Sequence, residues 1–183
     1  MEWWWLLPAL ALVLGGIWIY NLLVRRRNIV AEAWAGIDVQ LQRRHELVPN
    51  LVATVRGYRE HEAETLRELT LARSTRPDRV PELSRQETGL SRSLARLFAL
   101  AEDYPELKAS DNFRQLHAAL VEIEDHLQYA RRYYNGAVRD LNNLVESFPA
   151  NLVARSFGFR PADFFEIEFA SQRAAPRVGS FDD

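Results

Sequence analysis

The fold is decided by residues 111–148, DNFRQLHAALVEIEDHLQYARRYYNGAVRDLNNLVESF, in which apolar side chains recur at alternating steps of three and four. The members of this stripe are Phe113, Leu116, Leu120, Ile123, Leu127, Ala130, Tyr134, Ala137, Leu141, Leu144 and Phe148. Such steps place side chains on one helix face, and a stripe of about five heptads is typical of a coiled-coil-like bundle. A helix roughly 55 Å long needs other long helices beside it. The sequence therefore predicts an all-α fold.

Earlier segments supply partners for this helix. From Asn28 an apolar stripe with the same spacing runs to Ala72; its first members are Val30, Trp34, Ile37, Leu41, Val48, Val52 and Val55. Pro49 lies within it, and because proline removes a backbone hydrogen bond and clashes with the preceding turn, we expect a kink or a short break there. Residues 74–81, a polar segment with two prolines, predict a loop.

A shorter helix is expected over about residues 82–103. Ser84 and Glu87 form either a capping box at its start or, if the helix begins at Pro81, two polar positions on its outer face. Ser110 or Asp111 is the expected cap of the long helix that follows.

The start of the chain, MEWWWLLPALALVLGGIWIYNLLVRRR, predicts a membrane anchor. No charged residue occurs between Trp3 and Val24, a length that covers a hydrocarbon core of roughly 30 Å. A cleaved signal would have a basic start and a small-residue cleavage site, whereas this segment begins with Glu2 and ends in three arginines. No turn residues follow the arginines, so one continuous rod of anchor and first bundle helix is compatible with the sequence, which leaves open whether the two are continuous.

Both ends of the anchor carry the residues expected at a lipid–water interface. These are Trp3, Trp4, Trp5, Trp18, Tyr20, Arg25, Arg26 and Arg27. Arginine is costly to translocate, so the basic end should stay in the cytoplasm and the short N-terminal head should lie outside. The expected location is the bacterial inner membrane, crossed once.

Composition excludes several functional classes. The 183 residues carry a formal net charge of −2, which gives no basic footprint for nucleic acid. The chain contains no cysteine, so disulfides and thiolate chemistry are excluded. None of the four histidines follows a glutamate by three positions, as helical di-iron sites require. No phosphate-binding loop or nucleophile elbow is present, so we predict no enzyme activity, cofactor, metal or small-molecule substrate.

Aromatic residues are the candidate interaction sites: Trp34, Phe157, Phe159, Phe164, Phe165 and Phe169. Trp34 lies on the apolar stripe, where core packing is favoured over an interface role. The phenylalanines crowd a segment too short to bury them, so they either fold back on the bundle or dock on a neighbour. His45 is either a pH-sensitive group in the seam or, as we favour, a residue at the bundle edge.

Several motifs resemble the LemA family of bacterial membrane proteins. They include residues 20–25, 27–34 and 37–52, with Arg43-Arg44-His45-Glu46-Leu47-Val48 the most specific, and near the end Val145-Glu146-Ser147-Phe148-Pro149, Phe157-Gly158-Phe159 and Phe164-Phe165-Glu166. The resemblance implies an N-terminal anchor, a cytoplasmic bundle of long antiparallel helices and no established catalytic activity. It also implies relatives tied to membrane biogenesis, including formation of magnetosome membranes.

Three regions follow: an anchor at 1–27, a cytoplasmic helical bundle at 28–148, and a Phe-rich segment with a flexible tail at 149–183. The leading hypothesis is a non-enzymatic scaffold that self-associates as a homo-oligomer on the lipid bilayer. Ala11 and Gly15, four positions apart, either let two anchors approach closely or, as we favour, are a chance pair in an apolar span of this composition. The alternative is a membrane-tethered adaptor that binds another membrane protein, such as a protease or transporter, through the C-terminal aromatic residues.

Overall fold

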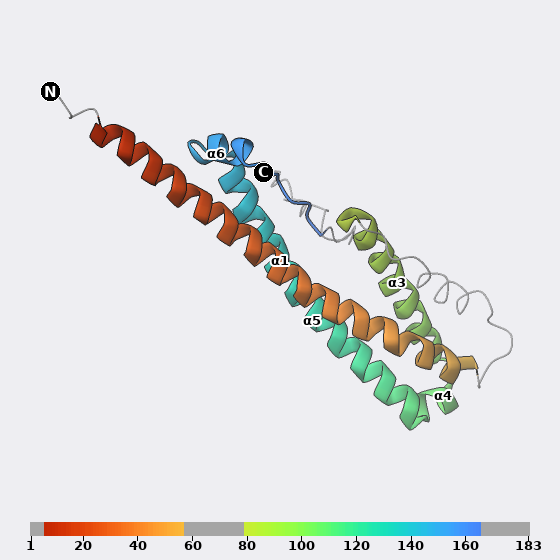
Figure 1. Cartoon of the computed structure of the whole chain (residues 1–183). Helices are drawn as coiled ribbons and strands as arrows, with labels where there is room; N and C mark the ends of the chain where they lie inside the picture. The colour runs from red at the N-terminus through yellow and green to blue at the C-terminus, as the bar shows by residue number, and fades with distance from the viewer. Residues whose placement is uncertain (1–5, 57–78, 166–183) are drawn as a thin grey trace, which may run out of the picture.

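The computed structural model describes residues 6–56 and 79–165, and regular secondary structure in these two ranges is entirely α-helical (Figure 1). The elements are α1 (Leu6–Arg56), α3 (Val80–Ala101), α4 (Pro105–Ala109), α5 (Asp111–Glu146) and α6 (Ala150–Ser156). The predicted all-α fold is confirmed. The predictions for Trp3, Trp4, Trp5, Phe169, the stretch 57–72 and the tail fall outside the described residues.

Helix α1 is one rod of 51 residues that carries both the apolar start and the first bundle stripe. The two are continuous, which the sequence left open, and of the two alternatives expected at Pro49 the break is wrong. Proline costs the helix one backbone hydrogen bond, but Val48, Leu51 and Val52 around it are buried. Because tertiary packing supplies most helical stability in proteins, these contacts hold the helix together across the proline.

Helix α5 runs antiparallel to α1 along much of its length (Figure 1). Its stripe is buried as predicted through most of its members: Phe113, Leu116, Leu120, Ile123, Leu127, Tyr134, Ala137 and Leu141. Ser110 caps its start, accepting a hydrogen bond from the Phe113 backbone N–H at 3.5 Å. The last predicted member is wrong, because α5 ends at Glu146 and the Phe148 side chain is 80% exposed.

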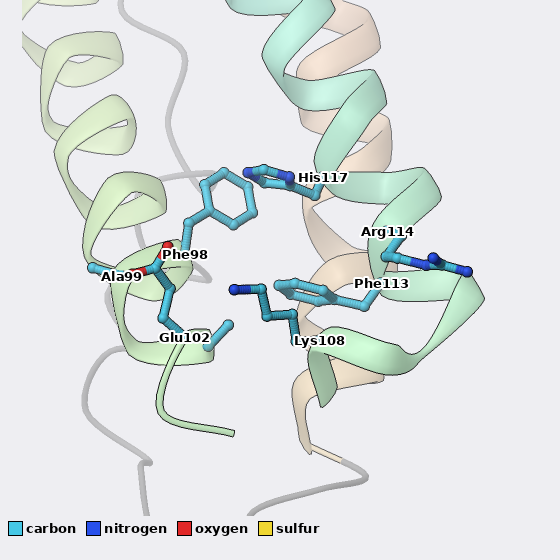
Figure 2. Close-up of a pocket in the computed structure, with 8 residues that line it drawn as sticks. Phe98, Ala99, Glu102, Lys108, Phe113, Arg114 and His117 are labelled. Atoms are coloured by element: carbon cyan, nitrogen blue, oxygen red, sulfur yellow. The ribbon is translucent and has the colours of Figure 1, made fainter. Parts of the chain in front are cut away.

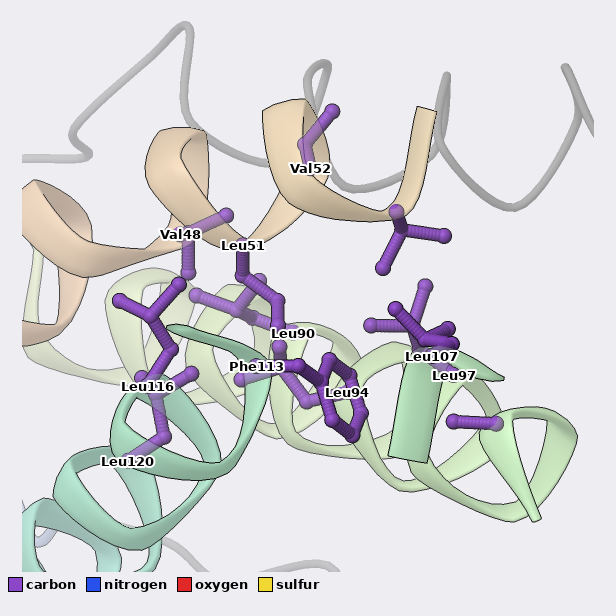
Figure 3. Packing of buried hydrophobic residues seen from close by; sticks show 12 residues of the cluster. Val48, Leu51, Val52, Leu90, Leu94, Leu97, Leu107, Phe113, Leu116 and Leu120 are labelled. Carbon is purple, nitrogen blue, oxygen red and sulfur yellow. The ribbon is translucent and has the colours of Figure 1, made fainter. Parts of the chain in front are cut away.

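Three clusters of buried side chains succeed one another along the bundle. The cluster farthest from the apolar start joins α1, α3, α4 and α5 (Figure 3). A middle cluster brings Ile37 of α1 and Leu83 of α3 against Leu127 and Val138 of α5, with Phe165. The third cluster packs Leu23 of α1 against Leu141 and Val145 of α5 and Ala154 of α6. The bundle is thus closed by different elements at its two ends.

Helix α3 begins earlier than expected, so the predicted loop over 74–81 extends too far. Val80 is its first residue, and Pro81 lies in its first turn, where a missing backbone N–H costs nothing. Neither interpretation of Ser84 and Glu87 is correct. They do not cap the helix, and they do not face outward, because both side chains are fully buried in the bundle.

Candidate functional site

The first part of α1 is apolar on all sides and exposed. Its large side chains, apart from the half-buried Ile19, are between 37% and 78% exposed: Leu6, Leu7, Leu10, Leu12, Val13, Leu14, Ile17, Trp18 and Tyr20. Among the described residues, α1 is the one helix long and apolar enough to cross a membrane. A core helix of this composition would be covered by protein, whereas here about fifteen residues of apolar surface face outward. We call Leu6–Tyr20 the apolar segment.

The basic residues that follow the apolar segment are partly tied to the bundle. Arg26 Nη1 lies 3.1 Å from Asp140 Oδ2 of α5, and the Arg27 guanidinium lies 5.3 Å from the centre of the Phe159 ring. Arg25 is exposed. Of the predicted interface aromatics that are described, Trp18 is exposed, while Tyr20 packs on Phe157 and Phe159 at 4.9 and 5.8 Å between ring centres.

The C-terminal phenylalanines differ in burial, and folding back on the bundle holds for Phe165. Phe165 folds back into the bundle and is fully buried, 6.1 Å from the ring of Trp34 and 5.1 Å from the guanidinium of Arg131. Trp34 also packs on Tyr134 and is half-buried, so it belongs to this internal aromatic cluster. In contrast, Phe157 and Phe164 stay 64% and 44% exposed.

Two asparagines of α5 clamp the extended segment that follows α6. Asn142 donates to the Ala162 carbonyl at 2.9 Å and accepts from the Ala162 N–H at 2.8 Å. Asn135, two helical turns earlier, makes the same pair of bonds to Phe165, at 3.0 and 2.9 Å. A side-chain amide carries the donor and acceptor of a peptide group, so each asparagine pairs with the segment as a neighbouring strand would.

Tyr134 adds a third tie, because its hydroxyl donates to the Asp163 carbonyl at 2.9 Å. Burial raises the pKa of Tyr134, and the negative charge of Asp163 acts in the same direction. The phenol therefore stays protonated and keeps its donor role at neutral pH.

A buried ionic cluster joins the three long helices at mid-bundle. Arg44 comes from α1, Glu87 from α3, and Glu124 and Arg131 from α5. Arg44 contacts Glu124 at 3.1 Å and Glu87 at 3.6 Å, and Arg131 lies 3.7 Å from Glu124. Arg44, Glu87 and Arg131 are at most 2% exposed. The two positive and two negative charges balance, which is the condition under which charges are tolerated in a protein interior.

Polar neighbours complete the ionic cluster. Arg44 donates to the Ser91 hydroxyl at 2.8 Å, and that hydroxyl lies 3.3 Å from Glu124. The favoured interpretation of His45, a residue at the bundle edge with its tip in water, is wrong, because its side chain is 25% exposed and its Nε2 lies 2.9 Å from the buried Glu87. Burial lowers the pKa of Arg131, while Glu124 opposes this shift and Arg44 reinforces it. The arrangement fixes the register of three helices.

Sequence reasoning missed the ionic cluster, although one signal was present. Ser84, Glu87 and Ser91 recur at steps of three and four beside the apolar stripe of α3, so they form a polar stripe of their own. A regular polar stripe indicates that this face of α3 packs against polar groups of another helix. Those groups are Arg44 of α1 and Glu124 of α5, and the spacing within α3 does not identify them.

An apolar groove opens at the end of the bundle farthest from the apolar segment (Figure 2). It has a volume of about 600 Å³ and lies between the end of α3 and the start of α5. Phe98 stands edge-on to His117, with 4.3 Å between ring centres, and Phe113 stacks on His117 at 6.2 Å. Charged residues at its rim include Glu102, Lys108 and Arg114.

The histidines are not part of a cluster of metal-binding residues in the described part of the chain. Across residues 6–56 and 79–165, no group of three or more His, Asp or Glu side chains is placed to hold a metal ion. His126 forms an exposed pair with Glu122 at 3.5 Å, one helical turn away, which is the surface contact expected of it. His61 lies outside the described residues.

Comparisons with known proteins agree on one family. The sequence model of the LemA family matches residues 33–181. Protein LemA of Metamycoplasma hominis is 28% identical over 80% of this chain and 68% of its own length. Magnetosome protein MamQ 2 of Paramagnetospirillum magneticum is 33% identical over 43% of this chain, and magnetosome protein MamQ of Magnetospirillum gryphiswaldense is 27% identical over 42%. The matched region spans 29% and 28% of those two magnetosome proteins.

Proposed function

This chain belongs to the LemA family, and we propose that it is a non-enzymatic, membrane-anchored scaffold that self-associates on the cytoplasmic face of the bacterial inner membrane. The observation that carries the proposal is the continuity of α1, which joins the exposed apolar segment to the buried bundle stripe without a break. An anchor continuous with the bundle transmits any clustering of the bundles to the membrane segments. The magnetosome relatives favour a role in membrane organisation or biogenesis.

The orientation rests on the three arginines that end the apolar stretch. Arg25, Arg26 and Arg27 immediately precede the bundle, and short basic flanks are retained in the cytoplasm. Arg26 and Arg27 also contact Asp140 and Phe159, so the basic flank and the end of α5 lie at the same level. The bundle then extends away from the cytoplasmic surface of the membrane.

A non-enzymatic role is supported by how the buried charges are used. Each charged side chain of the ionic cluster forms an ion pair with a residue from another helix or, for Arg131, with Glu124 of its own helix. Such pairs fix helix register instead of presenting a group to a substrate.

Self-association is supported by apolar surface on the bundle itself. Tyr129 and Tyr133 of α5, four positions apart on one helix face, are 66% and 57% exposed. In the apolar segment, the space around Gly15 is open within 4 Å of where a side chain would begin. Both surfaces are available to a second copy of the chain.

The test is the mass of the full chain in mild detergent, measured by light scattering with the detergent contribution subtracted. We expect a dimer or larger assembly, and a strict monomer contradicts the scaffold. Replacing Tyr129 and Tyr133 by glutamate should reduce the mass. The control variant Ala53→Glu, at an exposed position of α1, should not.

A second candidate function is a membrane-tethered adaptor for another membrane protein such as a protease or transporter. The groove at the far end favours it, because its apolar wall of Phe98 and Phe113 is rimmed by charges of both signs. Crosslinking in intact cells separates the two functions. An adaptor yields one dominant heterologous partner, whereas a scaffold is crosslinked to itself.

A further inference from the structure

Helix α6 packs beside the apolar part of α1 (Figure 1). Ala154 is fully buried in the same cluster as Leu23, with Val153 and Ile19 packed against it. The ring of Phe157 reaches Tyr20. The contacts of α6 therefore fall on residues that belong to the uncharged stretch of α1 and precede the arginines.

Apolar side chains on and beside α6 stay exposed. Leu152 is 57% exposed on the helix, where Arg155 and Ser156 are exposed as well. Phe148, just before the helix, is 80% exposed, and Phe157, directly after it, is 64% exposed although its ring contacts Tyr20. Ala150 and Ala154 already fill the inner face. Large exposed apolar side chains gathered within ten residues indicate a contact with an apolar environment.

Two exposed arginines lie on and just after α6. Residues 147–162 contain Arg155 and Arg160 and no acidic residue, while the exposed Glu146 and Asp163 lie immediately outside this range. An apolar face bordered by arginines is complementary to anionic lipid headgroups above acyl chains.

The depth of α6 follows from the anchor. If the arginines of α1 lie at the cytoplasmic headgroups, then Ile19 to Leu23 lie within about 10 Å of that level, since each helical residue adds about 1.5 Å. This is the zone in which interfacial helices bury their apolar faces. A protein element packed on Ile19 and Leu23 must enter the same zone.

We propose that α6, with Phe148 and Phe157 at its ends, is a second membrane contact that inserts its outer face into the anionic cytoplasmic leaflet. The inference rests on the anchor of the proposed function. It adds that the C-terminal end of α5 is held at the bilayer by its own lipid contact, so that the bundle is attached at two points and its tilt is restricted.

The experiment uses the absence of cysteine, which allows single spin labels on the full chain. Three variants are reconstituted in vesicles of phosphatidylcholine with one part in four of phosphatidylglycerol: Leu152→Cys on α6, Leu12→Cys in the apolar segment, and Ala53→Cys at an exposed position in the bundle part of α1. Power saturation then compares the accessibility of each label to oxygen, which enters the bilayer, and to a nickel chelate, which stays in water.

We expect the Leu152 label to be several-fold less accessible to nickel than the Ala53 label while remaining accessible to oxygen. Equal nickel accessibility at Leu152 and Ala53, with the Leu12 label in the hydrocarbon, overturns the lipid contact and leaves the anchor standing. Shielding of Leu152 from both reagents overturns it in favour of a protein neighbour. A Leu12 label in water overturns the anchor itself and this inference with it.

Discussion

The two halves of α1 share one backbone and differ in their surroundings. Between Leu6 and Tyr20 the apolar side chains point in every direction and stay exposed. Between Val30 and Val55 they follow one face and are mostly buried, while polar residues occupy the other face. The difference teaches that the pattern of apolar residues indicates what surrounds a helix. A helix with one apolar stripe packs on protein along that stripe and faces water on its other side. A helix that is apolar on all sides and not covered by protein is suited to lipid.

Charge follows the same division. The first half carries none, whereas the second half places Arg44 in the interior, where Glu87 and Glu124 neutralise it. A charge is thus tolerated in the bundle half when another helix brings its partner, a condition that a bilayer does not provide.

The largest effect is expected from charging the apolar half. Leu10→Arg combined with Leu14→Arg should cost about 5 to 7 kcal/mol of membrane insertion, since each arginine at a helix centre costs about 3 kcal/mol. The protein should leave the membrane pellet after an alkaline wash. Val39→Arg with Ala53→Arg, at exposed bundle positions, should stay in the pellet. If the Leu10→Arg and Leu14→Arg double variant stays in the pellet as wild type does, the two halves of α1 do not differ in their need for lipid.

A charge in the bundle half should instead unfold the protein. Leu41→Asp buries a carboxylate at a position 2% exposed and should lower the free energy of unfolding by about 4 kcal/mol. Urea denaturation of the detergent-solubilised chain, followed by circular dichroism, measures the loss. Val39→Asp, at a position of the bundle half that is 49% exposed, is the matched control and should shift the free energy by less than about 0.5 kcal/mol. Similar losses in the two variants would contradict the comparison.

The ionic cluster should show that a buried charge depends on its partner. Glu87→Leu leaves Arg44 buried with one partner fewer and should cost about 3 kcal/mol, because breaking a buried pair is more costly than replacing it whole. Adding Arg44→Met removes both charges, leaves Glu124 paired with Arg131, and should restore stability to within about 1 kcal/mol of wild type. The same denaturation experiment decides. Additive losses would mean that the charges do not act as a pair.

A smaller and local effect is expected where α5 holds the C-terminal segment. Asn142→Ala removes two hydrogen bonds to Ala162 and should weaken the clamp by about 2 kcal/mol. Hydrogen exchange should then accelerate by roughly 30-fold at residues 159–165, with the middle of α5 unaffected. Asn143→Ala, at an exposed neighbouring position, serves as the control and should exchange like wild type.

The smallest effect concerns pH. The pKa of Tyr134 is raised in the folded protein, so the stability linked to its protonated form is complete below the ordinary tyrosine pKa near 10 and is lost as pH rises through the folded value. Denaturation at pH 9 and at pH 11 should show this loss in wild type and a smaller one in Tyr134→Phe. That variant should also lose about 1 kcal/mol at pH 9 with the bond to Asp163. Tyr133→Phe, at an exposed position, should behave like wild type at both values.

Much of the fold could be predicted because the signals are local. The stripe of α5, the Ser110 cap and the all-round apolar start each depend on spacings within one helix. A local rule also predicts a break at Pro49, and that prediction is wrong. The packing of Leu51 and Val52 stabilises α1 by more than the one lost hydrogen bond costs. Phe148 fits the stripe by spacing, yet the helix ends before it.

The candidate sites were less predictable because their residues are far apart in the chain. The sequence around Glu87 is compatible with an exposed side chain and with one that pairs with Arg44. Only the position of α1 relative to α3 decides that Glu87 is buried against Arg44. Phe157 and Phe165 are equivalent by composition. One lies against Tyr20 at the edge and stays exposed, and the other is enclosed by Trp34 and Arg131.

The amino-acid sequence by itself determined that the chain is helical, that α1 begins with a segment suited to lipid, and that long stripes pack in a bundle, since hydrophobic period and length act within a single helix. The tertiary structure alone decided which charges neutralise each other, which asparagines clamp the last segment, and that α6 lies beside the anchor. These depend on which faces of separate helices meet. That choice is made by the packing of the whole bundle, in which each buried polar group requires a partner.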